Sequence, residues 1–381
     1  MDFVKYKLYQ LLKIKNGRDH KKLSKGNYPV YGSGGLMRYV DSYLYDKASI
    51  LLPRKGTLSN IQLVYGTPFW TVDTTYYTII NEKIVNYYYL WLYLKSLDLS
   101  GYDSGASIPS MTTKTYNSLT VFLPERSIQD IISNIIFSYD NYIENNNERI
   151  KLLEQMAENI YKEWFVRFRF PGYKNAEFGN GIPFGWNYTT LDKIVSFNRG
   201  ISYSSEEIEC DDGVNLINLK NIQSYGGFRR EGTKKYNGKY KESQVVKRGD
   251  LILGVTDMTQ DRRTVGHVAM IPTMKDVCVI SADLVRVNSK ISKVFLYSMF
   301  RYGFYSKYFS QFANGANVLH LKPGVLMNKK ILMPSKELID EFSKKVSPMM
   351  EMIDKLNLIN DNLIKQRDYL LPRLMSGKLE V

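Results

Sequence analysis

The sequence has few of the residues on which catalytic and metal sites are usually built. Only two cysteines, Cys210 and Cys278, and three histidines occur in 381 residues, and no CxxC pair is present. Two cysteines cannot form a disulfide framework, so we expect free thiols in a reducing compartment. Three dispersed histidines without a CxxC pair argue against a zinc site. The composition therefore excludes a disulfide scaffold and predicts no metal site.

Long hydrophobic runs are also missing. The most apolar run is the aromatic-rich YYYLWLYL at 87–94, which is far shorter than the roughly 20 residues that span a bilayer. The start, MDFVKYKLYQ, has no apolar core behind a basic segment, so we do not expect a secretion signal. The sequence predicts a cytoplasmic protein.

Motifs for nucleotide or methyl-group chemistry are absent as well. GTKKYNGKY (232–240) resembles a phosphate-binding loop, but it has five residues between its glycines instead of four, and Tyr240 replaces the required Ser or Thr. The glycine-rich YGSGG (31–35) precedes no predicted helix. No Pro-Pro pair of an adenine methyltransferase exists, and no spacing favours a Ser/His/Asp set. We therefore expect a non-catalytic protein.

What the chain does have is positive charge. Lys and Arg number 52 against 38 Asp and Glu, which gives a net charge of +14. The excess lies in residues 1–120 and 171–330, whereas 121–170 and 331–381 are close to balance. Two separate basic segments indicate two polyanion-binding surfaces, because Lys and Arg displace the counterions that surround phosphates. Two solvated basic surfaces without a ligand are the alternative.

The basic segments belong to an internal repeat. VFLPERSIQDII (121–132) returns 210 residues later as ILMPSKELIDEF (331–342), and SGASIPSM (104–111) lines up with NGANVLHL (314–321) at the same offset. KLYQLLKIKNG (7–17) lines up with TLDKIVSFNRG (190–200) at an offset of 183. The difference between the two offsets, 27 residues, predicts an insertion of about one hairpin's length in the second copy. Two copies are too few for a solenoid, so we expect two halves related by a pseudo-two-fold.

Residues 123–170 and 333–381 are predicted to be two long spacer helices. In the first, side chains at alternating spacings of three and four form a stripe that is typical of a coiled coil. The stripe consists of Ile128, Ile132, Ile135, Tyr139, Tyr142, Asn146, Arg149, Leu153, Met156 and Ile160. A helix of this length needs a partner stripe, which the second segment offers; core helices of ordinary domains are the alternative. The predicted helix–helix contacts are Ile135, Tyr142, Leu153, Ile160, Met352, Leu356, Leu363 and Leu370.

Polar residues and prolines refine the prediction for these helices. Asn146 within the stripe is expected to fix the register of the pair. Ser127 and Asp130 are expected to form a capping box at the start of the first helix. Leu338 replaces that carboxylate in the second copy, so we expect a less sharply defined start there. Ser347-Pro348 predicts a restart or a kink in the second helix.

The basic segments, residues 1–122 and 171–332, are predicted to be globular mixed α/β domains. Strand-like runs lie at 49–53, 61–66 and 74–80, and again at 250–255, 265–271 and 283–288. An aromatic-rich helix follows each set, at 86–97 and at 293–309. The predicted fold is therefore mixed α+β, with two domains joined by two long antiparallel coiled-coil helices.

Taken together, these phrases resemble the specificity subunits of type I restriction–modification systems. The similar stretches are YPVYGSGGLMRYVDSYLYD (28–46), SILLPRKGTLSNIQLVYG (49–66), FWTVDTTYY (69–77), SGASIPSM (104–111), LPERSIQDII (123–132), KEWFVRF (162–168), IPFGWNYTTLDKI (182–194) and LLPRLMSGKLEV (370–381). The resemblance covers essentially the whole chain and is loosest in 171–332. It implies two target-recognition domains, each reading one half of a split DNA target, at a distance that the helices fix.

The resemblance also implies partners. Two modification subunits, which carry S-adenosylmethionine and the adenine chemistry of DNA methylation, would dock on this chain. Restriction subunits, which use ATP and Mg, would join them, so no cofactor is expected in the chain itself. A split-target recognition subunit of a type IIG-like system is one alternative. The other is a coiled-coil scaffold whose basic segments bind RNA or acidic proteins.

Loops of the two basic segments are predicted to contact double-stranded DNA, with phosphate contacts setting position and base-edge contacts setting specificity. Arg54-Lys55-Gly56 directly follows a strand, which suits a loop against a phosphate backbone; a surface hairpin turn is the alternative. Gln260 and Asn221 suit adenine, and Arg262 and Arg263 suit guanine. The candidates in the first segment are Ser33, Arg38, Arg54, Lys55, Thr57, Ser59, Asn60, Ser104, Ser107 and Ser110. Those in the second are Lys220, Asn221, Arg229, Arg230, Thr256, Gln260, Arg262, Arg263 and His320.

Overall fold

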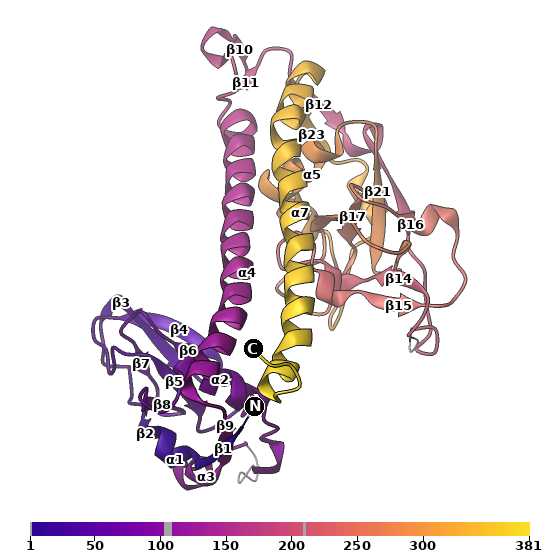
Figure 1. Cartoon of the computed structure of the whole chain (residues 1–381). Coiled ribbons are helices and arrows are strands. Elements are labelled where there is room, and N and C mark those ends of the chain that lie inside the picture. Colours follow the sequence, from indigo (N-terminus) through magenta and orange to yellow (C-terminus); the bar gives the residue numbers. More distant parts are fainter. Residues whose placement is uncertain (1, 103–108, 209–210) are drawn as a thin grey trace. The chain divides into compact units, whose positions relative to one another are not determined.

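The computed structural model of the chain describes residues 2–102, 109–208 and 211–381 (Figure 1). The chain divides into two compact units. Unit 1 comprises Met1–Glu144 and Asp361–Val381, and unit 2 comprises Asn145–Asn360. Each unit contains a mixed α/β domain together with one stretch of each long helix, so the predicted fold class is confirmed.

Unit 1 is built around a four-stranded sheet in the order β2-β8-β5-β6. All five residues of β5 are buried, which explains why Ile50–Pro53 are apolar throughout rather than alternating, while the buried Ser49 hydroxyl donates to the carbonyl of Thr78. A three-stranded sheet, β4-β3-β7, and the pair β1-β9 complete the domain. The elements are β1 (Val4–Lys7), α1 (Leu8–Leu11), β2 (Leu12–Asn16), β3 (Lys25–Gly32), β4 (Gly35–Val40), β5 (Ser49–Pro53), β6 (Gln62–Val64), β7 (Trp70–Thr71), β8 (Thr75–Ile80), α2 (Tyr87–Ser96), α3 (Thr113–Ser118), β9 (Thr120–Leu123) and α4 (Arg126–Tyr161).

Unit 2 has a four-stranded sheet in the order β13-β21-β17-β19 and a second in the order β15-β14-β20-β16. After α4, a π-helical turn at Lys162–Val166 places Trp164 and Phe165 in the core of this unit. The elements are β10 (Phe178–Gly179), β11 (Ile182–Pro183), β12 (Asn187–Thr190), β13 (Val195–Arg199), β14 (Val214–Ile217), β15 (Lys234–Tyr236), β16 (Val245–Val246), β17 (Leu251–Gly254), β18 (Thr256–Asp257), β19 (Val268–Met270), β20 (Cys278–Ile280), β21 (Leu284–Ser289), α5 (Lys293–Tyr302), α6 (Tyr305–Ser310), β22 (Leu319–His320), β23 (Lys330–Met333) and α7 (Lys336–Met375).

The repeated sequence segments form equivalent strand pairs in the two units. In unit 1, β1 pairs with β9 so that Val4 lies opposite Leu123. In unit 2, β12 pairs with β23 so that Asn187 lies opposite Met333. These partners differ by the same 183 and 210 residues as the repeated phrases. The orders β2-β8-β5-β6 and β13-β21-β17-β19 correspond strand for strand, whereas the second sheet of unit 2 has one strand more than its counterpart β4-β3-β7, namely β16.

The predicted strands and helices of the domains are found at their expected places, with one correction. Each of the six strand-like runs contains a strand, and α2 occupies the first aromatic-rich run. The second run, 293–309, is not one helix, because it breaks into α5 and α6 at Gly303 and Phe304. Phe304 has a φ of 66°, which a continuous right-handed helix excludes.

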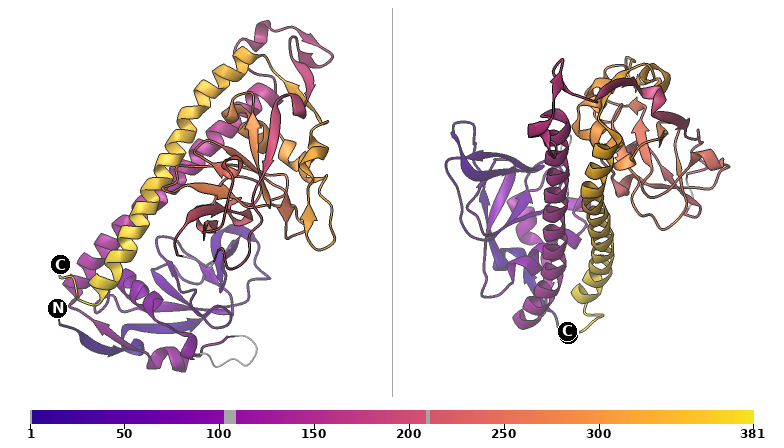
Figure 2. Two further views of the ribbon diagram at one scale, coloured as in Figure 1. Left: turned by 90° about the vertical axis from the view of Figure 1, so that its right-hand side faces the viewer. Right: turned by 90° about the horizontal axis from the view of Figure 1, so that it is seen from above.

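The two long helices pair antiparallel within each unit, and Figure 2 shows α4 and α7 side by side. In unit 1, Arg367 Nη1 donates to Asp140 Oδ1 at 2.6 Å. In unit 2, Asn146 Nδ2 donates to Asn360 Oδ1 at 2.8 Å, and both amides are buried. Asn146 thus joins the helices as the sequence predicted. α7 continues through Ser347-Pro348, so no new helix starts there.

Three of the ten residues of the predicted α4 stripe are displaced by one position. Ile132, Asn146 and the partly buried Leu153 lie on the inner face as expected, but Tyr142 is 66% exposed, and Arg149 and Met156 are also exposed. The residues that follow these three, Ile143, Ile150 and Ala157, are buried or partly buried instead. Of the predicted spacer contacts, Tyr142 and Met352 are therefore corrected to exposed positions. Leu356 is buried, and Ile135, Leu153, Ile160, Leu363 and Leu370 are partly buried.

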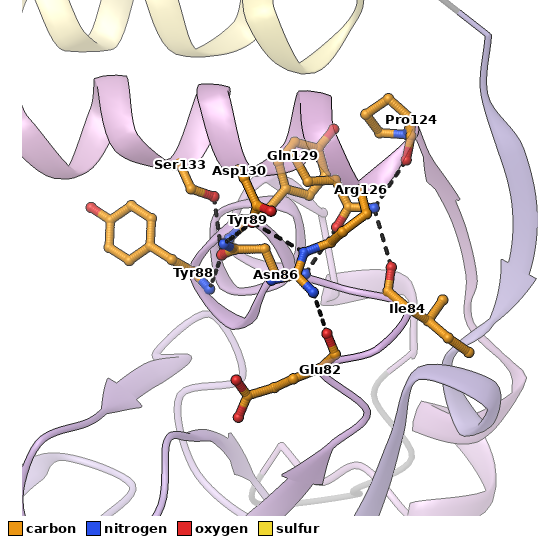
Figure 3. Close-up of polar contacts among 10 residues, drawn as sticks. All are labelled: Glu82, Ile84, Asn86, Tyr88, Tyr89, Pro124, Arg126, Gln129, Asp130 and Ser133. Atoms are coloured by element: carbon orange, nitrogen blue, oxygen red, sulfur yellow. Dashed lines mark hydrogen bonds and ion pairs between the residues drawn. The ribbon is translucent and has the colours of Figure 1, made fainter.

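The start of α4 is fixed by α2 rather than by the predicted capping box (Figure 3). Asn86, the residue before α2, accepts hydrogen bonds from the backbone N–H groups of Tyr88 and Tyr89. The same Oδ1 accepts from Ser133 Oγ at 3.0 Å, and Asn86 Nδ2 donates to Asp130 Oδ1 at 2.7 Å. Asp130 is therefore a partner of α2, and it does not cap its own helix.

Arg126 and Gln129 complete this joint (Figure 3). Arg126 Nε donates to Asp130 Oδ1 at 3.0 Å, and Nη1 donates to the carbonyl of Glu82. Gln129 Nε2 donates to the carbonyl of Pro124 at 2.9 Å, and its Oε1 accepts from the N–H of Asn86. Since the helix begins at Arg126, Ser127 lies inside it and cannot be its cap.

Unit 2 has a simpler joint at the corresponding residues. Ser292 caps α5, and Ser343 of α7, which corresponds to Ser133 at the 210-residue offset, donates to Ser292 Oγ at 2.6 Å. Ser335 Oγ accepts from the N–H of Leu338 at the start of α7. The prediction of a poorly capped second start is therefore wrong.

We expect Asn146→Ala to lower the free energy of unfolding by about 1–3 kcal/mol, because Asn360 Oδ1 would remain buried without its donor. Urea unfolding measures the change. The exposed neighbour Asn145 supplies the control, because Asn145→Ala removes the same amide from solvent. Equal losses in the two variants would contradict the role of the buried pair.

Candidate nucleic-acid interface

Three segments of unit 1 meet at one end of β5. The loop 54–60 follows β5 and pairs with 109–111, since Gly56 N donates to Pro109 O at 2.8 Å and Met111 N donates to Arg54 O at 3.1 Å. Lys55 and Ser110 form an antiparallel bridge there. Asn60 Nδ2 donates to Ser33 O in the β3–β4 turn at 2.5 Å. The structure thus brings seven candidates together: Ser33, Arg54, Lys55, Thr57, Ser59, Asn60 and Ser110.

Exposed cations and hydroxyls dominate this cluster. Arg54, Lys55, Thr57 and Ser59 are exposed. Gly56 has a φ of 99°, and a Cβ there would lie 3.2 Å from Ser33 Oγ, so glycine permits both the turn and the close approach. The loop therefore presents its basic and hydroxyl groups from a fixed backbone, as a phosphate-contacting loop requires.

Arg38 does not belong to this cluster. Its Nη2 donates to the carbonyls of Leu23, at 3.0 Å, and of His20. The guanidinium is thus part of the fold of unit 1, which corrects its predicted role in DNA contact. The candidates Ser104 and Ser107 lie outside the described residues.

The corresponding cluster of unit 2 is built on a buried carboxylate. Asp257 Oδ2 accepts from Thr264 N at 2.7 Å, and Oδ1 accepts from Thr259 N at 2.8 Å. The hydroxyls of both threonines donate to the same carboxylate. Burial raises the pKa of Asp257, but these donors outweigh it and hold the pKa below its usual value. The loop 258–263 is therefore folded around a fixed negative charge.

Four candidates meet on this loop and beside it. Gln260 Nε2 donates to Ala316 O at 2.7 Å, which ties the loop to the repeated phrase NGANVLHL. β18 and β22 place Thr256 opposite the exposed His320. Arg263 is exposed and pairs with Asp261 at 2.5 Å. Gln260, Arg262, Arg263 and His320 thus gather at one surface, whereas Thr256 is buried beneath it.

The remaining candidates of unit 2 lie around a short turn at 219–232. Lys220 and Arg229 are exposed. Asn221 is 0% exposed, and its amide donates to Arg229 O and Thr233 Oγ1, so it holds the turn and cannot read a base. Arg230 donates to Asp354 of α7 at 3.4 Å and is mostly buried. Asn221 and Arg230 are therefore corrected to structural roles.

Sequence reasoning missed two acidic residues, Asp354 and Asp257, whose hydrogen bonds hold loops of unit 2 in place. Asp354 also accepts from Arg248 Nε at 2.9 Å and from Thr273 Oγ1 at 2.6 Å, which fastens the domain of unit 2 to α7. In the sequence, the only sign of these two roles is that each residue is acidic within an otherwise apolar helix stripe or strand.

Among residues 2–102, 109–208 and 211–381, no helix has the length and apolarity to cross a bilayer, and no metal-binding cluster of acidic, His and Cys side chains is found.

Comparisons with known proteins identify relatives along most of the chain. Residues 1–155 match the family described as Type I restriction modification DNA specificity domain. The type I restriction enzyme MjaVIII specificity subunit of Methanocaldococcus jannaschii is 25% identical in an alignment of 314 positions that covers 79% of this chain and 72% of the relative. The HindI specificity subunit of Haemophilus influenzae is 25% identical over 379 residues, covering 83% of this chain and 81% of the relative.

A solved structure supports the same relationship at the level of the fold. The crystal structure of the S subunit of the type I restriction–modification system from M. genitalium matches with a TM-score of 0.68 at 14% sequence identity. The match covers 98% of this chain and 96% of that one. The fold that the resemblance implied is thereby supported over nearly the whole chain.

We expect Asp257→Asn to lower the free energy of unfolding by about 1–3 kcal/mol, because the N–H groups of Thr259 and Thr264 lose a charged acceptor. The folded pKa lies below the unfolded value of about 3.9. The stabilisation is therefore complete above that unfolded value and is lost as the pH falls through the folded pKa. Urea unfolding at a series of pH values measures the difference from the unsubstituted chain.

The control is Asp261→Asn, which changes an exposed carboxylate of the same loop. It should cost less than about 1 kcal/mol. A difference for Asp257→Asn that stayed constant down to pH 2, or that matched the control, would refute the role of the buried carboxylate.

Proposed function

We propose that this chain is a specificity subunit of a type I restriction–modification system, binds duplex DNA at a split target and reads one half with each unit. In this role it selects the sequence and catalyses no reaction. S-adenosylmethionine, ATP and Mg²⁺ serve the partner subunits. The proposal places the chain in the cytoplasm, where it meets chromosomal DNA.

One observation carries the proposal: the same loop pairing recurs in both units. In unit 1, Lys55 after β5 bridges Ser110 of the phrase SGASIPSM. In unit 2, Thr256 after β17 pairs with His320 of the phrase NGANVLHL. Ser110 and His320 are related by the 210-residue offset, and β5 and β17 occupy corresponding places in their sheets. Two copies of one surface on a single chain suit a target with two separate halves.

The chemistry of the two surfaces supports duplex DNA as the ligand. Each surface combines exposed cations with hydroxyl or amide groups on a backbone that hydrogen bonds hold in place. Cations neutralise phosphates irrespective of sequence, whereas an amide such as that of Gln260 can pair with adenine and a guanidinium such as that of Arg263 with guanine. Both surfaces lie in the segments that contain the whole positive excess of the chain.

Methyltransferase and restriction subunits are the expected protein partners. The internal repeat supports two methyltransferase subunits, since each copy offers a similar surface to one of them. A type IIG-like recognition subunit would share the surfaces but have different partners. A scaffold that binds RNA or acidic proteins would need the basic charge, but it would not need the equivalent loops that follow β5 and β17.

The test is the salt dependence of duplex binding by the chain with its methyltransferase partner. Lys55→Ala should lower the slope of log K against log salt by about 0.9 for each phosphate that Lys55 neutralises. Lys83→Ala is the control. Lys83 is also exposed, but it follows the end of β8, whereas the loop 54–60 lies at the start of β8, where Thr75 pairs with Pro53. Its slope should be unchanged.

Fluorescence anisotropy of a labelled duplex provides the measurement, with single-stranded RNA of equal length as competitor. Equal slopes for both variants would remove Lys55 from the interface. RNA that competes as well as the duplex would favour the scaffold and defeat the proposal.

A further inference from the structure

A pocket of about 560 Å³ lies in unit 2 beside the loop 258–263. One side is formed by Gln260, Asp261 and Arg262, and another by Phe304 and residues of α6. Tyr225 and His267 also line it. All of these residues belong to unit 2, so the pocket is a feature of that unit alone.

Backbone strain is concentrated at this pocket. Tyr225, Arg262 and Phe304 have φ values of 67°, 53° and 66°. In the described part of the chain, only Phe168 and Asn180 share this left-handed conformation among non-glycine residues. Bulky side chains rarely adopt it, and strained residues of this kind cluster where a ligand is held. Their convergence is an argument for a binding site.

Several buried polar side-chain atoms around the pocket have no hydrogen-bond partner within the described residues. His267 is 6% exposed and Ser306 is 2% exposed. Within the described residues, His267 Nδ1, Ser306 Oγ and Arg262 Nε have no hydrogen-bond partner. Burial lowers the pKa of His267, although hydrogen bonding to the backbone of Arg262 and Tyr225 and the charge of Asp257 act in the opposite direction. A ligand with donors and acceptors would satisfy these groups.

The side chains that face the pocket combine exposed aromatic rings with positive charge. Tyr225 is 59% exposed and Phe304 is 62% exposed, although both are large apolar groups. Arg262 and Lys307 supply cations, while Arg301 is held by Glu154 and Tyr297. The carboxylate Asp261 is paired with Arg263. Exposed rings beside cations are the combination that proteins use for unpaired nucleotides.

We propose that this pocket binds one unpaired nucleotide, with the base against Tyr225 and Phe304 and the phosphate near Arg262 and Lys307. The volume exceeds what a phosphate alone would fill, and the rings would have no role in holding a bare anion. The nucleotide comes either from bound DNA, by leaving the base stack, or from free nucleotide. The first source rests on the proposed function, whereas the second does not.

The first experiment titrates the full-length chain with the four deoxynucleoside monophosphates and follows their signals by saturation-transfer NMR. At least one should bind saturably. Phe304→Ala and Tyr225→Ala should each weaken that binding roughly 5- to 150-fold, the range for loss of one stacking ring. Tyr240→Ala is the control, since Tyr240 is another exposed tyrosine of unit 2 that lies outside this pocket.

A second variant separates binding from folding. Asn adopts a positive φ far more readily than Phe, so Phe304→Asn should leave the melting temperature equal or higher while binding is lost. If Phe304→Asn instead lowered the melting temperature and kept nucleotide affinity, Phe304 would be a structural residue and the proposal would fail.

The second experiment distinguishes the sources. 2-Aminopurine is placed at each position of the target duplex, which methylation-sensitive sequencing defines, and its fluorescence is read in the complex with the methyltransferase partner. A rise at one position of the half read by unit 2, lost in Phe304→Asn and kept in Tyr240→Ala, identifies bound DNA as the source. A rise that survives Phe304→Asn argues against the pocket.

The combined results of the two experiments test the nucleotide pocket and the proposed function separately. Monophosphate binding without any rise assigns the pocket to free nucleotide. Monophosphate binding without any duplex binding supports the pocket and defeats the proposed function. Normal duplex binding with neither a rise nor saturable monophosphate binding overturns the pocket and leaves the proposed function intact.

Discussion

The buried pair of Asn146 and Asn360 is the interaction on which the arrangement of the helices depends. A stripe that repeats every seven residues lets two helices slide by whole heptads while their apolar faces remain covered. The amide pair prevents this, because any other register leaves both amides buried without partners. A second bond, from Asn360 Nδ2 to Asn147 Oδ1 at 3.0 Å, gives the NH2 group of Asn360 an acceptor on α4 as well.

With the register set, charged residues on the helices can reach their partners on the domains. In unit 2, Asp354 of α7 binds Arg248 and Thr273, and Glu154 of α4 binds Arg301 at 3.1 Å. In unit 1, Asp140 of α4 binds Tyr88 of α2 as well as Arg367 of α7. In both units, moreover, the cap of a domain helix is also bonded to a serine of the long helix that follows it. Each domain is therefore fastened to its helices by several independent contacts.

Sequence reasoning predicted what depends on local pattern and missed what depends on side-chain direction. The strands at 49–53 and 284–289, the two long helices and both repeat offsets follow from apolar periodicity, which the fold preserves. The choice between Ile135 and Ile136, or between Tyr142 and Ile143, could not be made, because adjacent apolar residues fit either face of the helix. Asn221 and Arg230 look like surface residues in the sequence, yet both turn inward: Asn221 bonds across its own turn, and Arg230 bonds to Asp354, 124 residues along the chain. Asp130 fits a capping box, but its partner Asn86 lies 44 residues away.

The central claim of the proposal is that the length of the helix pair sets the spacing between the two halves of the DNA target. The most direct measurement deletes the matched heptads 139–145 and 361–367, which removes Asp140 and Arg367 together and keeps the Asn146–Asn360 pair. Methylation-sensitive sequencing of DNA modified by the complex then reads the target. Loss of about 10 Å of helix should shorten the spacer by about three base pairs and leave both half-sequences unchanged. An unchanged spacer, or a new half-sequence, would contradict the account.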